Sequence, residues 1–261
     1  MRLIPRRDKV AVVEVFGTIG GAVRSAPYEQ VFEQVRRSKA VKALVLDIDS
    51  PGGAVPASEY LYHSVAKVAE HKPVIASVRG VGASGSYLLA CASQHIVANP
   101  GALIGSIGVI SVRPMLQAAL EKLGVDINVT KSGSLKDMGA FWRPSTPEEE
   151  AKLQSLIDES YERFVSVVAR ARNIETADVR ALATGEVFWA PKALEVGLID
   201  ELGDLDTAVE RAAEIAGCGN RVVRMGPRRG FRQRLLGPFA ETFVESVSNE
   251  VERRLWVESL R

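Results

Sequence analysis

The chain has 261 residues, 46% of them hydrophobic, and a formal net charge of +1 at pH 7. This length and composition allow a sizeable core, as one large α/β domain or one domain with an extension. The near-neutral charge argues against nucleic-acid binding driven by bulk charge. The cysteines, Cys91 and Cys218, make no disulfide framework or C-x-x-C pattern, and the histidines are scattered, so no metal or cofactor is expected.

The N-terminal stretch combines several arginines with only a short apolar segment. Glu14 interrupts that segment, and no small-residue cleavage site follows it, so it does not resemble a secretory signal. No run approaches the roughly 20 apolar residues that a membrane-spanning helix needs. We therefore expect a cytoplasmic protein, either soluble or attached to the surface of the membrane.

Strand-like and helix-like segments alternate through the first half of the chain. Apolar runs typical of buried strands occur at 9–16, 43–48, 73–78, 95–98 and 126–130. Helical periodicity falls between them, at 28–37, 56–70, 84–93 and 114–123. This alternation predicts an α/β fold with a parallel sheet layered with helices.

The second half reads as mainly helical. Thr146, Pro147 and Glu149 supply a cap, a first-turn proline and a capping-box partner, so a long amphipathic helix should run to about residue 172. Further helices are expected at 176–182 and 204–216, with a short closing strand at 196–200.

The composition changes near residue 218. A basic linker is followed by a helix of about 18 residues whose apolar stripe consists of Phe239, Phe243, Val247, Val251 and Leu255. We therefore divide the chain into a main domain at 1–217 and a basic linker with an amphipathic helix at 218–261. The stripe suits packing on its own core or on another subunit, and the segment 228–255 also suits peripheral contact with anionic lipid.

Two glycine turns each follow a predicted buried strand. The first is Asp49-Ser50-Pro51-Gly52-Gly53, and the second is Gly82-Ala83-Ser84-Gly85-Ser86. Glycines at such turns let backbone N–H groups point toward a ligand, because no Cβ blocks the geometry. A serine beside free backbone donors, with a lysine later in the chain, is the arrangement of a Ser–Lys acyl-transfer site. Ser84 is the candidate nucleophile.

Lys136 is the candidate base, in the polar loop that ends at about residue 144. It must be neutral to accept a proton, and lowering its pKa from about 10.4 to near 7 costs roughly 4.6 kcal/mol. Burial in an apolar pocket can supply such a shift. Nearby apolar residues available for that pocket are Leu135, Met138, Ala140, Phe141 and Trp142. Asp137 must point away, because a carboxylate beside the lysine would stabilise its charged form.

Other motifs allow other interpretations. The run from Gly80 to Gly85 satisfies G-x-G-x-x-G, but the acidic residue expected at the end of the next strand is absent. Ser64 and Lys67 form an S-x-x-K match, yet no S-D-N follows. The spacing of the histidines marks none of them as the base of a Ser-His-Asp triad.

Taken together, the motifs resemble those of the S49 family of serine peptidases, the signal peptide peptidase A (SppA) and SohB group, over about residues 9–216. The resemblance is carried by Asp49–Gly53, Gly80–Tyr87, Gly105–Val109 and Ser132–Asp137, in family order and with family-like spacing. It implies a layered ClpP/crotonase-like fold and a catalytic domain at 1–217. It also implies Ser84 as nucleophile, Lys136 as general base, Gly53 and Gly85 as oxyanion-hole donors, and Ser106 as the group that orients the lysine.

The resemblance further implies an endopeptidase that cleaves apolar peptides, such as remnant signal peptides, through an acyl-enzyme, and a homo-oligomer. Two departures stand out: Ser86 replaces a usual glycine and could narrow the site, and no N-terminal membrane anchor is recognisable. A crotonase-type acyl-CoA hydratase or isomerase and a non-catalytic scaffold that binds peptides or membranes are the alternatives.

Overall fold

A computed structural model describes residues 8–227 of the chain. The strands are β1 (Lys9–Phe16), β2 (Val41–Ser50), β3 (Val74–Ala83), β4 (His95–Ala98), β5 (Leu103–Gly105), β6 (Val187–Trp189), β7 (Glu201–Leu202) and β8 (Val222–Arg224). The helices are α1 (Ser25–Arg37), α2 (Val55–Ala69), α3 (Gly85–Ala90), α4 (Gln117–Lys122), α5 (Pro147–Arg172), α6 (Thr176–Leu182), α7 (Ala190–Glu195) and α8 (Leu205–Ala216), with a 3-10 turn, η1 (Ser134–Asp137). The predicted C-terminal helix, with its stripe at 239–255, lies outside the described residues.

The sheet has the strand order β6-β5-β3-β2-β1-β8, and β4 pairs with both β3 and β7. All of these pairs are parallel except β5 with β6. The central strands are near-continuous apolar runs because helices cover both faces of the sheet, as parallel strands require. The long strand β3 pairs with β4 through its first half and with β5 at its end. This second pairing brings Gly105 beside Ala83, at the edge where the glycine turns begin.

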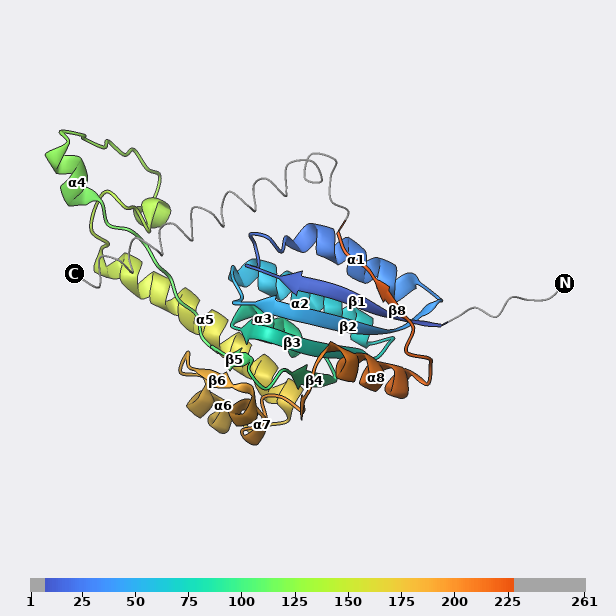
Figure 1. Cartoon of the computed structure of the whole chain (residues 1–261). Coiled ribbons are helices and arrows are strands. Elements are labelled where there is room, and N and C mark those ends of the chain that lie inside the picture. The colour runs from blue at the N-terminus through green and yellow to red at the C-terminus, as the bar shows by residue number, and fades with distance from the viewer. Residues whose placement is uncertain (1–7, 228–261) are drawn as a thin grey trace, which may run out of the picture. The chain divides into compact units, whose positions relative to one another are not determined.

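Two apolar layers hold the sheet between its helices (Figure 1). On one face, α1, α2, α3 and α5 bury residues such as Phe32, Leu61, Leu89 and Val165 against the sheet. On the other face, α8 packs its buried alanines and Val209 against outward-facing residues of β1 to β4. The side chains alternate between the layers along each strand, as the two-residue period of a strand dictates.

Most of the predicted elements are present, including the α5 start, where Thr146 and Glu149 form the expected capping box. The predictions of strands at 126–130 and 196–200 are wrong. Residues 126–130 have no regular structure, and Ile127 and Val129 are exposed. An apolar run needs a neighbouring strand to complete its hydrogen bonds, and this segment pairs with no strand of residues 8–227. The closing strand, β7, begins one residue past the predicted segment, at Glu201.

Residues 110–146, here called the arm, project beyond the N-terminal end of α5 (Figure 1). The arm contains α4 and η1, and its exposed apolar residues are Ile110, Val112, Met115, Leu116, Leu123, Val125, Ile127, Val129 and Phe141. Besides the Thr146 capping box, it is joined to the neighbouring α5 by hydrogen bonds of Ser134 to Glu148 and of Arg143 to Glu149. Within residues 8–227, no helix is long and apolar enough to cross a lipid bilayer.

The described residues up to Gly226 form one compact unit. Its last strand, β8, pairs with β1 and so extends the sheet past residue 217. The predicted division of the chain into 1–217 and 218–261 remains a prediction.

Candidate active site

Ser84 lies in the tight turn between β3 and α3. Its backbone has φ 53° and ψ −125°, a conformation that non-glycine residues rarely adopt. The Ser84 N–H donates to the Gly105 carbonyl at 2.8 Å, and the Leu88 N–H donates to the Ser84 carbonyl at 3.0 Å. These bonds hold the turn in its strained form, while the Ser84 hydroxyl has no hydrogen-bond partner among residues 8–227. Backbone strain of this kind is concentrated at functional sites.

The Pro-Gly-Gly turn after β2 lies directly against the start of α3. A Cβ on Gly52 would come within 2.6 Å of the Gly85 nitrogen, and a Cβ on Gly53 would come within 2.0 Å of the Ile19 carbonyl oxygen. Both glycines also have positive φ angles, of 89° and 155°. No residue with a side chain fits at either position. Close packing of backbone on backbone therefore explains why the sequence has two glycines after Pro51.

This packing brings the two expected oxyanion donors close together. The Gly53 nitrogen lies 3.5 Å from the position that a Cβ on Gly85 would occupy. Among the described residues, neither the Gly53 nor the Gly85 N–H donates to another protein group, and Gly85 opens a helix, where N–H groups lack intrahelical partners. Two free N–H groups next to a serine can stabilise an oxyanion.

Ser106 follows the end of β5, just as Ser84 follows the end of the neighbouring strand β3. Ala83 pairs with Gly105, so the two serines each follow a member of the same β3–β5 pair. Ser106 also has a positive φ, of 49°, and its N–H donates to the Glu186 carbonyl at 2.7 Å. Besides these two serines, Asn173, which caps α5, is the remaining described non-glycine residue with positive φ. The structure therefore brings Ser84 and Ser106 together.

Lys136 is not brought to Ser84 within the chain. It lies in η1 on the arm and is exposed, so the neighbouring apolar residues do not bury it here. The η1 turn is attached near Glu149, by the Ser134–Glu148 hydrogen bond and through Arg143, whereas Ser84 shares its cavity with Ser160, further along the same helix α5. Eleven helical residues correspond to about 16 Å, more than a lysine side chain spans. The candidate base and the candidate nucleophile are thus separated in a single copy.

Asp137 pairs with basic side chains other than that of its neighbour Lys136, as a neutral base would require. Its carboxylate accepts from Lys131 Nζ at 2.6 Å and from Arg143 Nε at 3.0 Å. These hydrogen bonds, first that of Arg143 and then that of Lys131, hold the pKa of Asp137 well below its usual range. Arg143 also donates to Glu149, and with the Thr146 N–H it lowers the pKa of Glu149 to about 2. The η1 turn is therefore tied to the start of α5 by paired charges.

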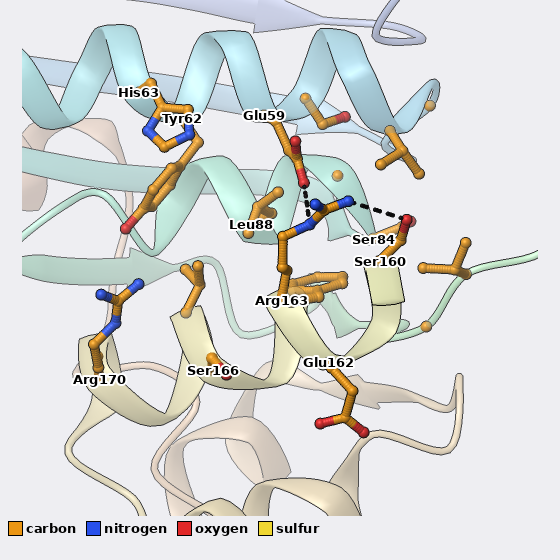
Figure 2. Close-up of a pocket in the computed structure, with 18 residues that line it drawn as sticks. Glu59, Tyr62, His63, Ser84, Leu88, Ser160, Glu162, Arg163, Ser166 and Arg170 are labelled. Carbon is orange, nitrogen blue, oxygen red and sulfur yellow. Dashed lines mark hydrogen bonds and ion pairs between the residues drawn. The ribbon is translucent and has the colours of Figure 1, made fainter. Parts of the chain in front are cut away.

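A cavity of about 330 Å³ opens beside Ser84 between α2, α3 and α5 (Figure 2). Gly53, Ser84 and Gly85 line one end, and Tyr62, His63 and Arg170 line the other. Much of its wall is apolar, with Val55, Leu88, Val109, Phe164 and Val167 contributing. An ion pair between Glu59 Oε1 and Arg163 Nε, 3.2 Å long, lies between the ends.

The sequence did not single out the cavity residues of α2 and α5. A signal is visible in hindsight, because Val55, Ser58, Glu59 and Tyr62 fall at helical spacing on one face of α2. That spacing alone does not distinguish a cavity wall from a face packed in the core. Which face of a helix borders an opening is decided by tertiary packing, which a single sequence does not report.

The other motif residues have structural partners. Ser86 does not narrow the site: it is fully buried, and its hydroxyl bonds to the Ser50 carbonyl at 2.6 Å and the Ala83 carbonyl at 2.8 Å. The Ser64 hydroxyl donates to the Tyr60 carbonyl within α2. Burial raises the pKa of the Cys91 thiol to about 12, so Cys91 is no nucleophile. Among residues 8–227, no cluster of histidine, cysteine and carboxylates is suited to a metal ion.

The strained serine turn, the paired glycine donors and the apolar cavity together define an α/β protein with the architecture of a serine hydrolase. Comparison with known proteins specifies the family: the chain belongs to peptidase family S49, whose family model matches residues 66–219. It is therefore a member of a serine peptidase family, as the motifs suggested.

Two curated relatives illustrate the extent of the similarity. A putative protease of Synechocystis, slr0021, is 42% identical over 211 residues, covering 81% of this chain and 76% of the relative. A putative signal peptide peptidase SppA of Enterococcus faecium is 35% identical over 179 residues, covering 68% of this chain. The match spans only 52% of the E. faecium protein, about half its length.

Among solved structures, a point mutant of the 1510-N membrane-bound stomatin-specific protease superposes with a TM-score of 0.53. The match covers 85% of this chain and 99% of that chain at 16% identity, so it bears on the fold alone. With the layered sheet described above, it confirms the expected layered α/β fold.

Proposed function

We propose that the chain is a serine endopeptidase with Ser84 as its nucleophile and the N–H groups of Gly53 and Gly85 as its oxyanion hole. The observation that carries the proposal is the strained Ser84 turn, whose hydroxyl and adjacent N–H groups have no partners among the described residues and border an apolar cavity. A folded protein rarely retains strain and unpaired donors without a use for them.

In the proposed reaction, neutral Lys136 accepts the Ser84 hydroxyl proton as the serine oxygen attacks the peptide carbonyl. The carbonyl oxygen becomes an oxyanion and takes hydrogen bonds from Gly53 and Gly85, each contributing about 3 kcal/mol to transition-state stabilisation. The C–N bond then breaks, and protonated Lys136 gives its proton to the leaving amine. Water attacks the resulting ester with Lys136 again as base, which releases the acid and restores Ser84.

Because Lys136 does not reach Ser84 of its own chain, a second copy of the chain must supply it. The arm is suited to this because it projects from the body, carries Lys136 exposed in η1, and presents a large exposed apolar surface. Exposed apolar residues of this extent mark association surfaces in soluble proteins. Docking onto a neighbouring copy would also desolvate the lysine, which a neutral amine requires. Ser106, beside Ser84, is the proposed hydrogen-bond partner that orients the incoming amine.

This proposal makes the active enzyme a homo-oligomer, whose catalytic sites lie between copies. A repeated contact in which one copy reaches into the next is heterologous, and it closes into a ring when the rotation permits. Light scattering is expected to show an oligomer, and an active monomer would contradict the arrangement.

For substrates, we propose extended apolar peptides, such as the remnants of signal peptides. The apolar cavity beside Ser84 suits aliphatic side chains, and the E. faecium relative bears the name of a signal peptide peptidase. The backbone of the substrate peptide would form hydrogen bonds with the glycine turns beside Ser84. The cavity would select among the substrate side chains, as in other peptide-binding sites. Contact of residues 228–255 with a membrane surface would bring such substrates close.

The test is digestion of casein and a synthetic signal peptide, with products mapped by mass spectrometry. The wild type is expected to cleave both, and Ser84→Ala and Lys136→Ala are each expected to abolish cleavage while thermal unfolding stays unchanged. A fluorophosphonate probe should label Ser84. An acyl-CoA enzyme of the crotonase type would not need Ser84, and a non-catalytic scaffold would cleave no peptide. Full activity in Ser84→Ala, or no cleavage by the wild type, would therefore refute the proposal.

A further inference from the structure

The cavity beside Ser84 is an elongated groove whose walls are α2 and α5 (Figure 2). Along α2, the wall residues run from Val55 at the serine end through Glu59 to His63. Along α5, they run from Ser160 through Arg163 to Arg170. Both helices therefore lead away from Ser84 in the same direction, and Leu88 of α3 lies between them.

An ion pair crosses this groove part of the way along. Arg163 Nε lies 3.2 Å from Glu59 Oε1, and the Arg163 guanidinium also donates to the Ser160 hydroxyl at 3.5 Å. Both the Val55-to-Glu59 and the Ser160-to-Arg163 steps are about one helical turn, which leaves roughly 5–6 Å between the serine end and the bridge. Beyond it, the groove continues for about 6 Å along α2 and about 10 Å along α5.

The space on the near side of the bridge fits a short aliphatic side chain. The space beyond it is lined by Tyr62, Leu88 and Val167, so it is suited to the apolar end of a longer side chain. A long side chain can enter that space only if the bridge opens, because the guanidinium and carboxylate lie across the path (Figure 2).

We propose that the Glu59–Arg163 ion pair determines specificity: it closes the groove and restricts the substrate side chain held next to Ser84 to small and aliphatic types. This inference rests on the proposed peptidase function, and it adds which residues set the substrate preference. Opening the bridge converts the site into one that accepts long aromatic side chains.

The bridge can be removed without unfolding the protein. The side chain of Arg163 is 61% exposed and that of Glu59 is 34% exposed, and ion pairs of this exposure contribute little to stability. The variants Glu59→Ala, Arg163→Ala and the double variant should therefore fold. The charge-swapped variant, Glu59→Arg with Arg163→Glu, keeps a bridge of opposite polarity at the same place.

The experiment measures kcat/KM for peptides that differ in one residue, with Ala, Leu or Phe placed at each of the three positions before the scissile bond. The wild type is expected to prefer Ala or Leu over Phe at the position that enters the groove. In the double alanine variant, the ratio of kcat/KM for Phe to that for Leu at this position should rise by about 10-fold or more. The charge-swapped variant should keep the wild-type ratio.

Arg180→Ala is the matched control. Arg180 pairs with Glu162, a neighbour of Arg163 on α5 whose side chain points away from the bridge, so this variant should keep the wild-type ratio. An unchanged ratio at all three positions in the double alanine variant would overturn the inference. Loss of cleavage of the Ala peptide in every bridge variant would overturn it too, because the bridge would then serve catalysis rather than selection. A wild type that cleaves no peptide would instead contradict the proposed function.

Discussion

Gly85→Ala probes the contact that aligns the two proposed oxyanion donors. The new Cβ would lie 2.1 Å from the Ser58 Oγ and 2.8 Å from the Ser58 Cβ, far inside van der Waals contact. Ser58 is buried, and its hydroxyl donates to the Ala54 carbonyl at 3.1 Å, so it has little freedom to move away. The start of α3 must therefore shift from α2 and carry the Gly85 N–H away from that of Gly53.

Overpacking of this kind costs about 1–3 kcal/mol of stability. For a domain of this size, each kcal/mol corresponds to roughly 2–4 °C in Tm. Catalysis should suffer more, because losing one aligned oxyanion donor lowers kcat by about 100-fold to 1,000-fold. We expect Gly85→Ala to remain folded with a slightly lower Tm and to lose at least about 100-fold in kcat on a cleavable peptide.

Ser58→Gly supplies the matched rescue, since it removes both atoms that the new Cβ would meet. Glycine inside α2 costs about 1 kcal/mol of stability, so this change alone should leave kcat near the wild-type value. The double variant should recover much of the kcat lost in Gly85→Ala. The assay is steady-state cleavage of a fluorogenic peptide, with Tm from circular dichroism. A Gly85→Ala protein with wild-type kcat would refute the reasoning.

Three further predictions concern single side chains. Ser106→Ala should lower kcat by about 10-fold to 100-fold without changing Tm, because the lysine loses one hydrogen bond that strengthens as it takes the Ser84 proton and becomes charged; unchanged kcat in peptide cleavage would remove Ser106 from the site. Thr146→Ala deletes the α5 cap and should cost about 1 kcal/mol in urea unfolding, and an unaltered midpoint would contradict this. Burial favours the neutral acid of Asp200, but Arg172 and the Ile96 N–H outweigh it and lower its pKa. Its stabilising effect is then present above its unfolded pKa of about 3.9 and lost as pH falls through the folded value. Asp200→Asn should accordingly destabilise the protein at pH 7, and the difference from wild type should shrink as the pH falls below the unfolded pKa of about 3.9; a constant difference would contradict the assignment.

Much of the fold follows from local pattern. The runs that became β1 to β3 are buried on both faces, so their apolar character is continuous and unmistakable. The start of α5 was equally clear, since its capping box uses residues three positions apart. The short strands β6 and β8 were missed because a three-residue edge strand is defined by its partner, here β5 or β1.

The segment at 126–130 shows the opposite error. Its alternating apolar residues resemble a strand, but on the arm they find no pairing partner among the described residues and stay exposed. The same pattern serves a surface that we propose docks on a second copy. Periodicity reports that a residue prefers burial, and it does not report against which molecule.

The candidate site also contains residues that local sequence patterns predict and residues whose placement they do not predict. Ser84, Gly53, Gly85 and Ser106 were marked by local turn chemistry and by the family resemblance, and the structure brings all four to one edge of the sheet. The family resemblance and the motif spacing predicted Lys136 as the base. No sequence pattern indicates whether it acts on Ser84 of its own chain or of another copy. The ion pair across the groove was not foreseen, because its two members lie on separate helices about a hundred residues apart.

The most direct test of a serine and a lysine meeting between copies is to mix two inactive proteins. Ser84→Ala supplies an intact Lys136, and Lys136→Ala supplies an intact Ser84, so mixed oligomers would contain some complete sites. If each site takes one residue from each of two neighbours, random equal mixing should restore about a quarter of wild-type activity. No recovery in mixed oligomers that are shown to form would contradict the account.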